Sequence, residues 1–423
     1  MVLLHFESIK FSEEKDSIKG IFLRNFYFDI EKNELKKIGS YHIKDGNLEI
    51  EGKEEIVQRN FNTLLDRKLK ELKSMSGKEA IYVYKGFMPL QGCLYFGMID
   101  RNTNIIEIRP ITGCNLNCIF CSVDLCRRQR DFVVNSDYLI EETEKLAKQK
   151  LEQFKTLRNK EISSAQKSED SLGIEIHINA MGEPLLYSPL ADLIKGLKKI
   201  KNVKTISIDT NGSLLTESKV DELVKAGLTR FNISMNAFSA ETAKKIAGIP
   251  YPFENVKKIC KYITKKADIL LAPVWLNGIN DKDIEDIIKF SLEVREIRNK
   301  RKPLQLTPFI GVQNFLEYEK GKKPVKEKSW DEFFEFLKKL EEKYKIKLKL
   351  TREDFGIVAA KTEKTFRKDE IIDAKIVSEG MFRGEKLCVA NNRIISVFSD
   401  KKKGRLKLKI TRDKYNIFYG TEL

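Results

Sequence analysis

The sequence predicts an α/β protein built on a partial (β/α)6 TIM-like barrel, with an N-terminal α+β extension and a small C-terminal β-barrel. Three observations support this prediction: strands and helices alternate in the middle, cysteines cluster after the first of these strands, and a short basic β-rich segment ends the chain. A length of 423 residues suggests two or three domains. We expect an N-terminal domain over 1–103, the barrel over 104–312, a connecting helix and strand over 313–360 and the β-barrel over 361–423.

The N-terminal region mixes short β-like runs with one helical stretch, from about Glu54 to Lys73, in which apolar residues recur near a 3.6-residue period. It contains no catalytic motif. The chain meets an acid, Glu7, before a signal-peptide apolar run could form, and it has no run of about eighteen apolar residues. We therefore expect a cytoplasmic protein with no membrane span.

Six strand candidates, each followed by a stretch of helical length, define the barrel. They are Ile105–Arg109, Ile174–Ile178, Thr205–Asp209, Arg230–Met235, Ile269–Val274 and Leu304–Ile310. This alternation is typical of parallel strands joined by crossover helices, and six units predict an incomplete barrel. A further helix is expected at about 329–345, followed by a Lys-rich strand at 346–350.

The seven cysteines are unevenly distributed, and the set Cys114, Cys118, Cys121 and Cys126 lies within thirteen residues. Disulfide frameworks spread pairs through small secreted domains, so this clustering indicates metal binding instead. The first three have CxxxCxxC spacing on a loop after the first barrel strand, the end where such barrels host chemistry. Three thiolates leave one iron of a [4Fe–4S] cluster without a protein ligand. That iron could bind S-adenosylmethionine (SAM) and pass it one electron, which would yield methionine and a 5′-deoxyadenosyl radical.

The alternative for these cysteines is a zinc site. Zinc prefers four ligands in paired spacing, whereas the chain has only three histidines, and Cys126 has the wrong offset for a fourth ligand. The sequence therefore favours an iron–sulfur cluster.

Residues 104–312 resemble the radical SAM superfamily at four further places. Phe120 precedes the last cysteine, as in the family's motif, where this residue borders the adenine. The second strand ends in an element similar to the family's GGE/GEP motif, namely Gly182-Glu183-Pro184, and the resemblance implies that Gly182 and Glu183 contact the methionine amino group.

The resemblance continues after the later strands. Positions that match family contacts to ribose and carboxylate are Asp209, Thr210, Asn211, Ser234 and Asn236. Pro273 and Val274 lie where the family's backbone meets adenine. Each motif alone also fits an ordinary turn, but their order at successive strand ends favours a SAM site.

The C-terminal segment from 361 has 16 Lys and Arg against 9 Asp and Glu, a net charge of +7. A small, basic, all-β segment is typical of an OB-like nucleic-acid binder. Through Glu379–Glu385 and Gly404–Thr411 it resembles a TRAM domain, a module of tRNA-modifying enzymes. The candidate RNA contacts, acting through phosphates, are Arg383, Lys401, Lys402, Lys403, Arg405, Lys407 and Arg412.

The chain departs from the radical SAM methylthiotransferases, which carry three more N-terminal cysteines. Residues 1–100 offer only Cys93, and nothing in the spacing of Cys93, Cys126, Cys260 and Cys388 indicates an auxiliary cluster or identifies a methyl-carrying thiol. The whole chain most resembles archaeal radical SAM proteins with a C-terminal TRAM module.

These observations support modification of a tRNA nucleoside, by methylation or methylthiolation-type chemistry on a hypermodified adenosine near the anticodon. A ferredoxin or flavodoxin would supply the electron. The net charge of +16 also favours a polyanionic partner. The alternatives are methylation or maturation of a protein or peptide, and a non-catalytic RNA-binding protein with a structural cluster. The last does not account for an open iron or a Gly-Glu-Pro element.

Overall fold

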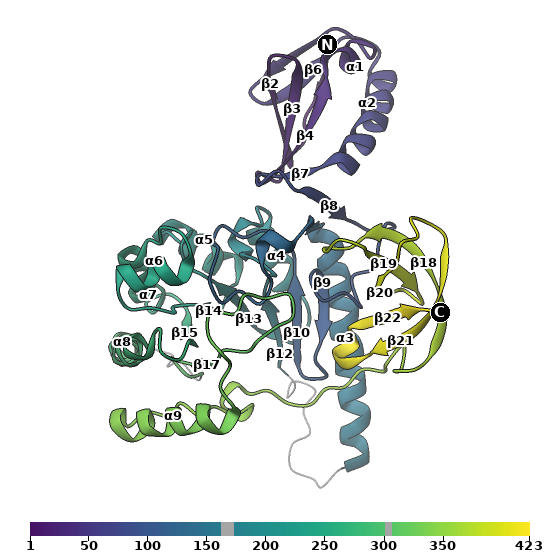
Figure 1. Ribbon diagram of the computed structural model, residues 1–423. Coiled ribbons are helices and arrows are strands. Elements are labelled where there is room, and N and C mark those ends of the chain that lie inside the picture. The colour runs from purple at the N-terminus through teal and green to yellow at the C-terminus, as the bar shows by residue number, and fades with distance from the viewer. Residues whose placement is uncertain (162–172, 301–306) are drawn as a thin grey trace.

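The computed structural model describes residues 1–161, 173–300 and 307–423. Its centre is a sheet of six strands, five of them parallel (Figure 1). In spatial order the strands are β15 (Asp268–Leu271), β14 (Arg230–Ile233), β13 (Val203–Thr210), β12 (Ile174–Ile178), β10 (Ile105–Arg109) and β9 (Gly97–Asp100). The predicted partial α/β barrel is therefore confirmed. Its edge strand β9 is antiparallel to β10 and lies before the expected start of the barrel.

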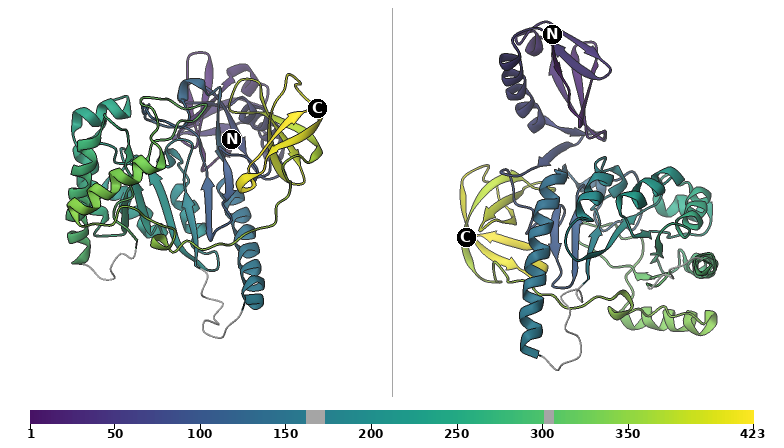
Figure 2. Two further views of the ribbon diagram at one scale, coloured as in Figure 1. Left: turned by 60° about the horizontal axis from the view of Figure 1, so that its bottom comes forward. Right: turned by 180° about the vertical axis from the view of Figure 1, so that it is seen from behind.

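Helices connect and cover the parallel strands (Figure 2). They are α3 (Ser136–Glu161), α4 (Leu190–Leu197), α5 (Glu217–Ala226), α6 (Ala240–Ala247), α7 (Phe253–Ile263) and α8 (Asp281–Asn299). Local sequence sets several of these boundaries: the Ser239 hydroxyl caps the N-terminus of α6, and Gly248 ends it with φ 71°.

The last expected barrel strands differ in detail from the structure. The fifth strand ends at Leu271, and Val274–Trp275 form a separate strand, β16, paired in parallel with β17 (Gln313–Asn314). Part of the expected sixth strand, 301–306, lies outside the described residues, but Ile310 forms a parallel bridge with Leu271.

The prediction of a strand at 346–350 is wrong, because the described residues there form no strand. Helix α9 (Trp330–Tyr344) ends at Lys345, which has a left-handed conformation. The Glu341 carboxylate then accepts hydrogen bonds from the backbone N–H groups of Leu348 and Lys349, at 2.6 and 2.8 Å. Because a side chain satisfies these donors, they do not join a strand ladder.

The N-terminal residues form a lobe that projects from the barrel (Figure 1). One sheet contains β1 (Val2–Leu4), β6 (Asn47–Ile50) and β5 (Tyr41–Lys44); the other contains β2 (Ile9–Glu13), β3 (Ser17–Phe22), β4 (Phe26–Glu31), β7 (Lys73–Ser74), β8 (Glu79–Val83) and β11 (Arg130–Val134). Two helices complete the lobe, α1 (Lys32–Lys36) and α2 (Glu54–Lys68). Since β11 directly follows the loop that carries the clustered cysteines, its parallel pairing with β8 joins the lobe to that loop.

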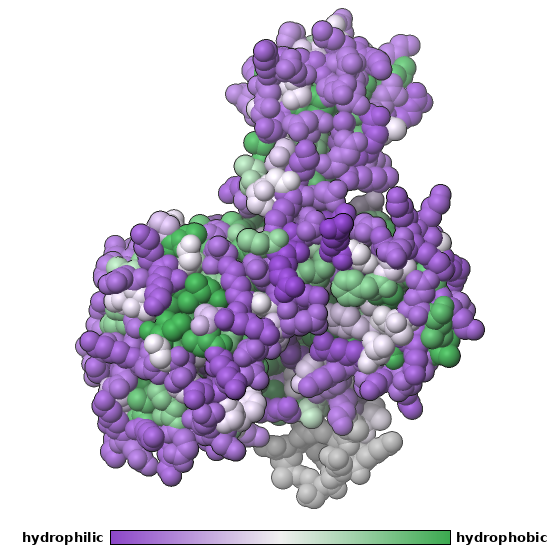
Figure 3. Space-filling view, in the orientation of Figure 1, coloured by the Kyte–Doolittle hydropathy of each residue, from purple (hydrophilic) through white to green (hydrophobic). Residues whose placement is uncertain are grey.

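The surface of the lobe is largely hydrophilic in the view of Figure 3, whereas apolar residues gather on the barrel, around β14. Among the described residues, no helix has the length and apolarity needed to cross a membrane.

The C-terminal strands close into a five-stranded barrel, as the sequence predicts. They are β18 (Ile371–Glu379), β19 (Glu385–Ala390), β20 (Arg393–Phe398), β22 (Phe418–Glu422) and β21 (Arg405–Arg412), in barrel order. This small barrel packs on the edge of the central sheet. The backbone of Gln91 and Gly92 accepts hydrogen bonds from Ile394 and Phe418 at 2.8 and 3.0 Å, and the buried Tyr95 hydroxyl donates to the Glu385 carboxylate.

The chain entering the small barrel is tied to the central sheet by a buried cation. Lys150 on α3 is fully buried; its ammonium group bonds the Asp100 carboxylate and the carbonyl oxygens of Thr103 and Ala360, at 2.8 and 3.0 Å for the carbonyls. Burial lowers the pKa of Lys150, whereas Asp100 raises it. Such a cation is stable inside a protein only when it is paired and fully hydrogen-bonded.

Candidate active site

The cysteine loop runs from the end of β10 to β11 and is fixed on two sides. The backbone N–H groups of Asn117 and Ile119 donate to the C-terminal carbonyls of α6, at 3.0 and 2.9 Å. On the other side, the Lys322 N–H donates to the Cys121 carbonyl at 2.9 Å. Gly248 permits the first contact, because a Cβ there would lie 2.3 Å from the Asn117 carbonyl oxygen. Tertiary contacts therefore hold the loop in position.

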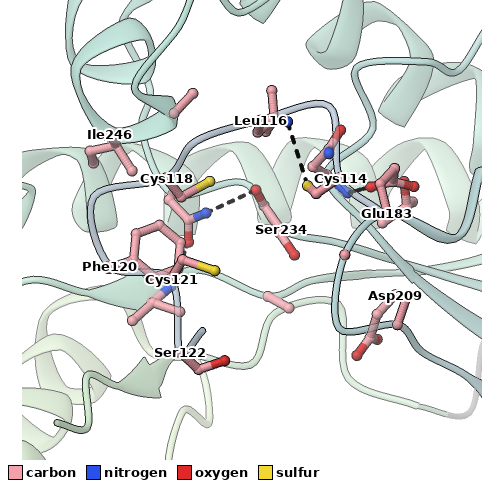
Figure 4. Close-up of a pocket in the computed structure, with 18 of the residues that line it drawn as sticks. Cys114, Leu116, Cys118, Phe120, Cys121, Ser122, Glu183, Asp209, Ser234 and Ile246 are labelled. Atoms are coloured by element: carbon pink, nitrogen blue, oxygen red, sulfur yellow. Dashed lines mark hydrogen bonds between the residues drawn. The ribbon is translucent and has the colours of Figure 1, made fainter. Parts of the chain in front are cut away.

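The three cysteines are half-buried and line one cavity of about 330 Å³. Their sulfur atoms point toward a shared space (Figure 4). Within the described part of the chain, no three His, Cys, Asp or Glu side chains are placed to hold a single metal ion. A shared space lined by three thiols fits a four-iron cluster, in which each thiolate binds a different iron.

Burial controls the protonation of these thiols. It raises the pKa of Cys114 to about 11 and that of Cys118 to about 12, and the neighbouring thiols add to the rise in Cys118. Both thiols therefore hold their protons near neutral pH until a ligated metal replaces them.

Arg128 supplies positive charge next to the cysteines. Its side chain lines the same cavity, is only 3% exposed and donates one hydrogen bond to the Thr112 carbonyl. The Nε atom is buried without a partner among the described residues. A buried guanidinium with a free donor suits the anionic charge of a cluster held by three thiolates. No motif in the sequence marks this residue as part of the site.

The Gly182-Glu183 pair packs directly on the cysteine loop. A Cβ at Gly182 would lie 2.0 Å from the carbonyl oxygen of Gly113, and the Glu183 N–H donates to that same oxygen at 2.8 Å. The Glu183 carboxylate accepts hydrogen bonds from the Thr210 hydroxyl at 2.7 Å and from the Asn211 N–H at 2.8 Å. Burial raises the pKa of Glu183 to about 7, and the hydrogen bonds oppose this rise. The carboxyl group therefore titrates near neutral pH.

A second polar group lies next to Glu183, where β12 and β13 end. His177 bonds Asp209 at 3.1 Å through Nε2 and Ser207 at 2.9 Å through Nδ1. Burial alone would lower the pKa of His177, but the Asp209 carboxylate outweighs it and raises this pKa to about 9. Burial would raise the pKa of Asp209, but His177 and Asn232 lower it. The pair is therefore an imidazolium and a carboxylate at neutral pH.

The structure brings most of the other predicted SAM contacts into the cysteine cavity: Phe120, Gly182, Glu183, Asp209, Thr210, Asn211, Ser234, Asn236 and Val274 line it. The Asn236 amide accepts from the Val274 N–H at 2.8 Å and donates to the Ser234 carbonyl at 3.1 Å. Pro184 and Pro273 do not line the cavity. Pro184 is buried at the start of a 3-10 turn, where its fixed φ suits the first position.

The remaining cysteines lie apart. Burial raises the pKa of Cys93, Cys260 and Cys388 to about 12 in each case, whereas Cys126 is exposed in a short turn near the end of the cysteine loop. None of these four cysteines lines the cysteine cavity. Among the described residues, none of them belongs to a group of side chains placed to hold a metal ion.

The predicted RNA contacts all lie on the small barrel. Arg383, Lys401, Lys402, Lys403, Arg405 and Lys407 are exposed. Lys401 pairs with Glu422 at 2.7 Å, and the half-buried Arg412 places its guanidinium 5.6 Å from the Tyr419 ring. The side chains of Lys401 and Arg412 therefore already contact other residues of the small barrel.

The small barrel contacts the cysteine loop directly and also through Lys320. Lys320 places its ammonium group 5.8 Å from the Phe382 ring and 5.6 Å from the Phe398 ring, and its carbonyl accepts from the Asp124 N–H at 2.9 Å. The Gln129 N–H also donates to the Met381 carbonyl at 2.8 Å. The turn that carries Arg383 is therefore packed next to the cysteine loop.

Comparison with known proteins agrees with this arrangement. The family described as the Radical SAM superfamily matches residues 108–291. The chain is 35% identical over 365 residues to "Uncharacterized protein MJ0103" of Methanocaldococcus jannaschii, covering 80% of each protein. The fold and the three-cysteine site define an iron–sulfur protein that binds SAM, and the chain belongs to the radical SAM superfamily. This membership implies a [4Fe–4S] cluster and SAM as cofactors.

Two further matches cover only part of the chain. It is 30% identical over 208 residues to a GTP 3′,8-cyclase of Clostridium botulinum, which covers 47% of this chain and 56% of that protein. Among solved structures, "Structure of TYW1 with a lysine-pyruvate adduct bound" aligns with a TM-score of 0.37 and 19% identity, over 59% of this chain and 76% of that one. A similarity of this size carries no functional argument.

Proposed function

We propose that this protein is a radical SAM enzyme that modifies a tRNA nucleoside, by methylation or methylthiolation-type chemistry on a hypermodified adenosine near the anticodon. The observation that carries the proposal is the position of the small barrel, whose exposed basic residues begin at the turn next to the catalytic loop. The barrel's five-stranded closure and its sequence resemblance to TRAM domains support the same partner.

The residues of the cysteine cavity fit the cofactors. Cys114, Cys118 and Cys121 would hold a [4Fe–4S] cluster, and Arg128 would balance part of its negative charge. Glu183 would bind the amino group of SAM, with its carboxylate fixed by Thr210 and Asn211. When bound, these cofactors supply one-electron cleavage of SAM and abstraction of a hydrogen atom from the substrate, with an electron from a ferredoxin or flavodoxin.

The exposed cations suit a phosphate backbone. Arg383, Lys402, Lys403, Arg405 and Lys407 form no ion pair with an acidic side chain in the part of the chain that the structure describes. Each cation that meets a phosphate releases a counterion, so the affinity for tRNA should fall steeply with salt. Replacing Arg405 and Lys407 by Gln should weaken binding and reduce the salt slope by about 2.

Mass spectrometry of tRNA nucleosides tests the proposal. A deletion strain should lack one modified nucleoside that its parent contains, wild-type protein should restore it, and Cys118→Ala protein should not. The Cys118→Ala protein should also lose SAM cleavage and the brown chromophore after anaerobic reconstitution. An unchanged nucleoside profile would rule out tRNA as the substrate and would favour a protein or peptide. Retained SAM cleavage in Cys118→Ala would refute the cluster assignment.

A further inference from the structure

A second cavity, of about 650 Å³, opens next to the cysteine cavity. We name it the aromatic antechamber; its wall includes Arg101, Tyr318, Trp330, Phe334 and Lys349. Both cavities are lined by Phe120, Ser122, Asn179, Val274 and Gln313, so they meet at this shared wall. The volume lies within the range of about 300–1,000 Å³ that is usual for ligand pockets.

The outer wall of the antechamber comes from a region beyond the 108–291 family match. Trp275 on β16 stacks on Phe336 of α9, with ring centroids 4.1 Å apart and planes at 6°, and donates from its indole N–H to Asp281 at 2.8 Å. A capping box between Ser329 and Glu332 fixes the first turn of α9. The helix is therefore held rigidly against the catalytic barrel, with Trp330 as its first residue.

Aromatic side chains form an open platform at the rim. Trp330 is 54% exposed and Tyr318 is 50% exposed. The Phe334 ring lies 5.8 Å from the Trp330 ring, at an angle of 32°, and has the Lys349 ammonium group 4.4 Å from its centroid. Large aromatic groups left open at a cavity mouth are typical of a surface that binds a planar ring.

The charge of the antechamber has one sign. Arg101 and Lys349 are its only charged lining residues, and no acid lines it within the described ranges. Arg101 bonds the Glu107 carboxylate through Nε and Nη2, at 2.8 and 2.7 Å, which leaves further N–H donors on a side chain that is 44% exposed. Two cations in a cavity lined by aromatic rings suit a ligand that combines a planar ring with an anion.

We propose that the aromatic antechamber binds a nucleotide that has been unstacked from its neighbours, with the base against Trp330 and Phe334 and the phosphate near Lys349 and Arg101. This inference rests on the proposed function, and it names a single unstacked nucleotide as the part of the RNA that the protein recognises. An enzyme that acts on a base within folded RNA must extrude it first, and an aromatic platform offsets the lost stacking. From the antechamber, the reacting atom would reach the cysteine cavity past the shared wall.

The two tryptophans of the chain, Trp275 and Trp330, provide a direct readout. Transfer RNA from the deletion strain, AMP and adenosine are each titrated into the full-length, reconstituted protein. Stacking of a base on the exposed Trp330 should quench its emission, whereas the buried Trp275 should respond little. In Trp330→Phe the quenching should disappear. Trp330→Ala should bind the nucleotide about 5- to 150-fold more weakly.

The phosphate contact has its own test. Wild-type protein should bind AMP more tightly than adenosine, and Lys349→Gln should reduce this difference. Tyr84→Ala is the matched control, because Tyr84 is also an exposed aromatic residue, at 42%, and lines neither cavity. Melting temperatures would show that each variant is folded.

The outcomes separate the sources of the nucleotide and the two proposals. Quenching by tRNA indicates a nucleotide within RNA, and quenching by AMP alone indicates a free nucleotide; both support the antechamber. Absence of quenching by all three probes, or quenching that persists in Trp330→Phe, overturns it. If the probes quench Trp330 as expected but the tRNA nucleosides of the deletion strain are unchanged, only the proposed function is refuted. If the nucleosides change but Trp330→Ala protein keeps full tRNA-modifying activity, only the antechamber proposal is refuted.

Discussion

Gly182→Ala should inactivate the enzyme through a steric clash of known size. The new Cβ would lie 2.0 Å from the Gly113 carbonyl oxygen and 2.5 Å from that of Thr112, whereas ordinary contacts begin at 3.4 Å. Both obstacles are backbone atoms, so the two loops must separate by about 1.4 Å. That separation breaks the 2.8 Å hydrogen bond from the Glu183 N–H to Gly113 and moves Glu183 away from the cysteine loop.

The expected loss follows from this displacement. A misplacement of about 1 Å in a catalytic site can cost about 100-fold in rate, and overpacking costs about 1–3 kcal/mol of stability. We expect SAM cleavage, measured as 5′-deoxyadenosine formed per minute by the reconstituted protein, to fall about 100-fold. Gly311→Ala is the control, because its Cβ would meet only side-chain atoms at 3.5 and 3.6 Å. Cleavage by Gly182→Ala within threefold of wild type would refute the reasoning.

Three further predictions concern buried side chains that can gain or lose a proton. First, the Glu183 pKa is raised to about 7, so the folded protein keeps a proton that the unfolded chain loses above about pH 4.5. This group's contribution to stability should therefore decrease as pH rises from about 4.5 to 7, and Glu183→Gln should remove that part of the pH dependence in melting curves of the cluster-free protein; identical slopes would contradict this. Second, Lys150→Met leaves Asp100 buried and unpaired, so the free energy of unfolding measured in urea should fall by about 3–5 kcal/mol. Lys148→Met, which removes an exposed ion pair, should lower it by less than about 1 kcal/mol. Equal losses in the two variants would contradict this prediction. Third, because the pKa values of Cys114 and Cys118 are near 11 and 12, their alkylation by iodoacetamide in cluster-free protein should speed up steadily from pH 7 to pH 10; a rate that levels off near pH 8 would contradict it.

Local patterns were sufficient to predict much of the fold. The bounds of β10 and β12 agree with the sequence expectation residue for residue, because a short isoleucine-rich run that is buried along almost its whole length is a local signal. The cysteine loop was predicted because its spacing is itself the chemical signal. Most motifs at the strand ends then meet in one cavity, as the topology of parallel strands requires.

Features that depend on distant contacts were not predicted. Strand β9 has only four residues, all buried, and therefore carries no periodic signal. Arg128 follows another arginine in the chain, a pattern typical of a solvated surface, and only the folded loop buries it. The antechamber combines residues from about 101 to 350, so no sequence window contains it.

The small barrel covers the edge of β9, and this limits how its role can be tested by truncation. Phe418 and Ile394 of the small barrel bond the backbone just before β9, where Gly92 has φ 108° and no room for a Cβ beside Ile394. A chain cut before residue 361 would expose the apolar residues that pack against the small barrel, such as Leu90 and Tyr95. It would also leave an open strand edge, which promotes aggregation. A truncated protein that lost activity would report this damage and not the loss of RNA contacts. Substitutions on the exposed side of the small barrel therefore separate recognition from folding, and deletion does not.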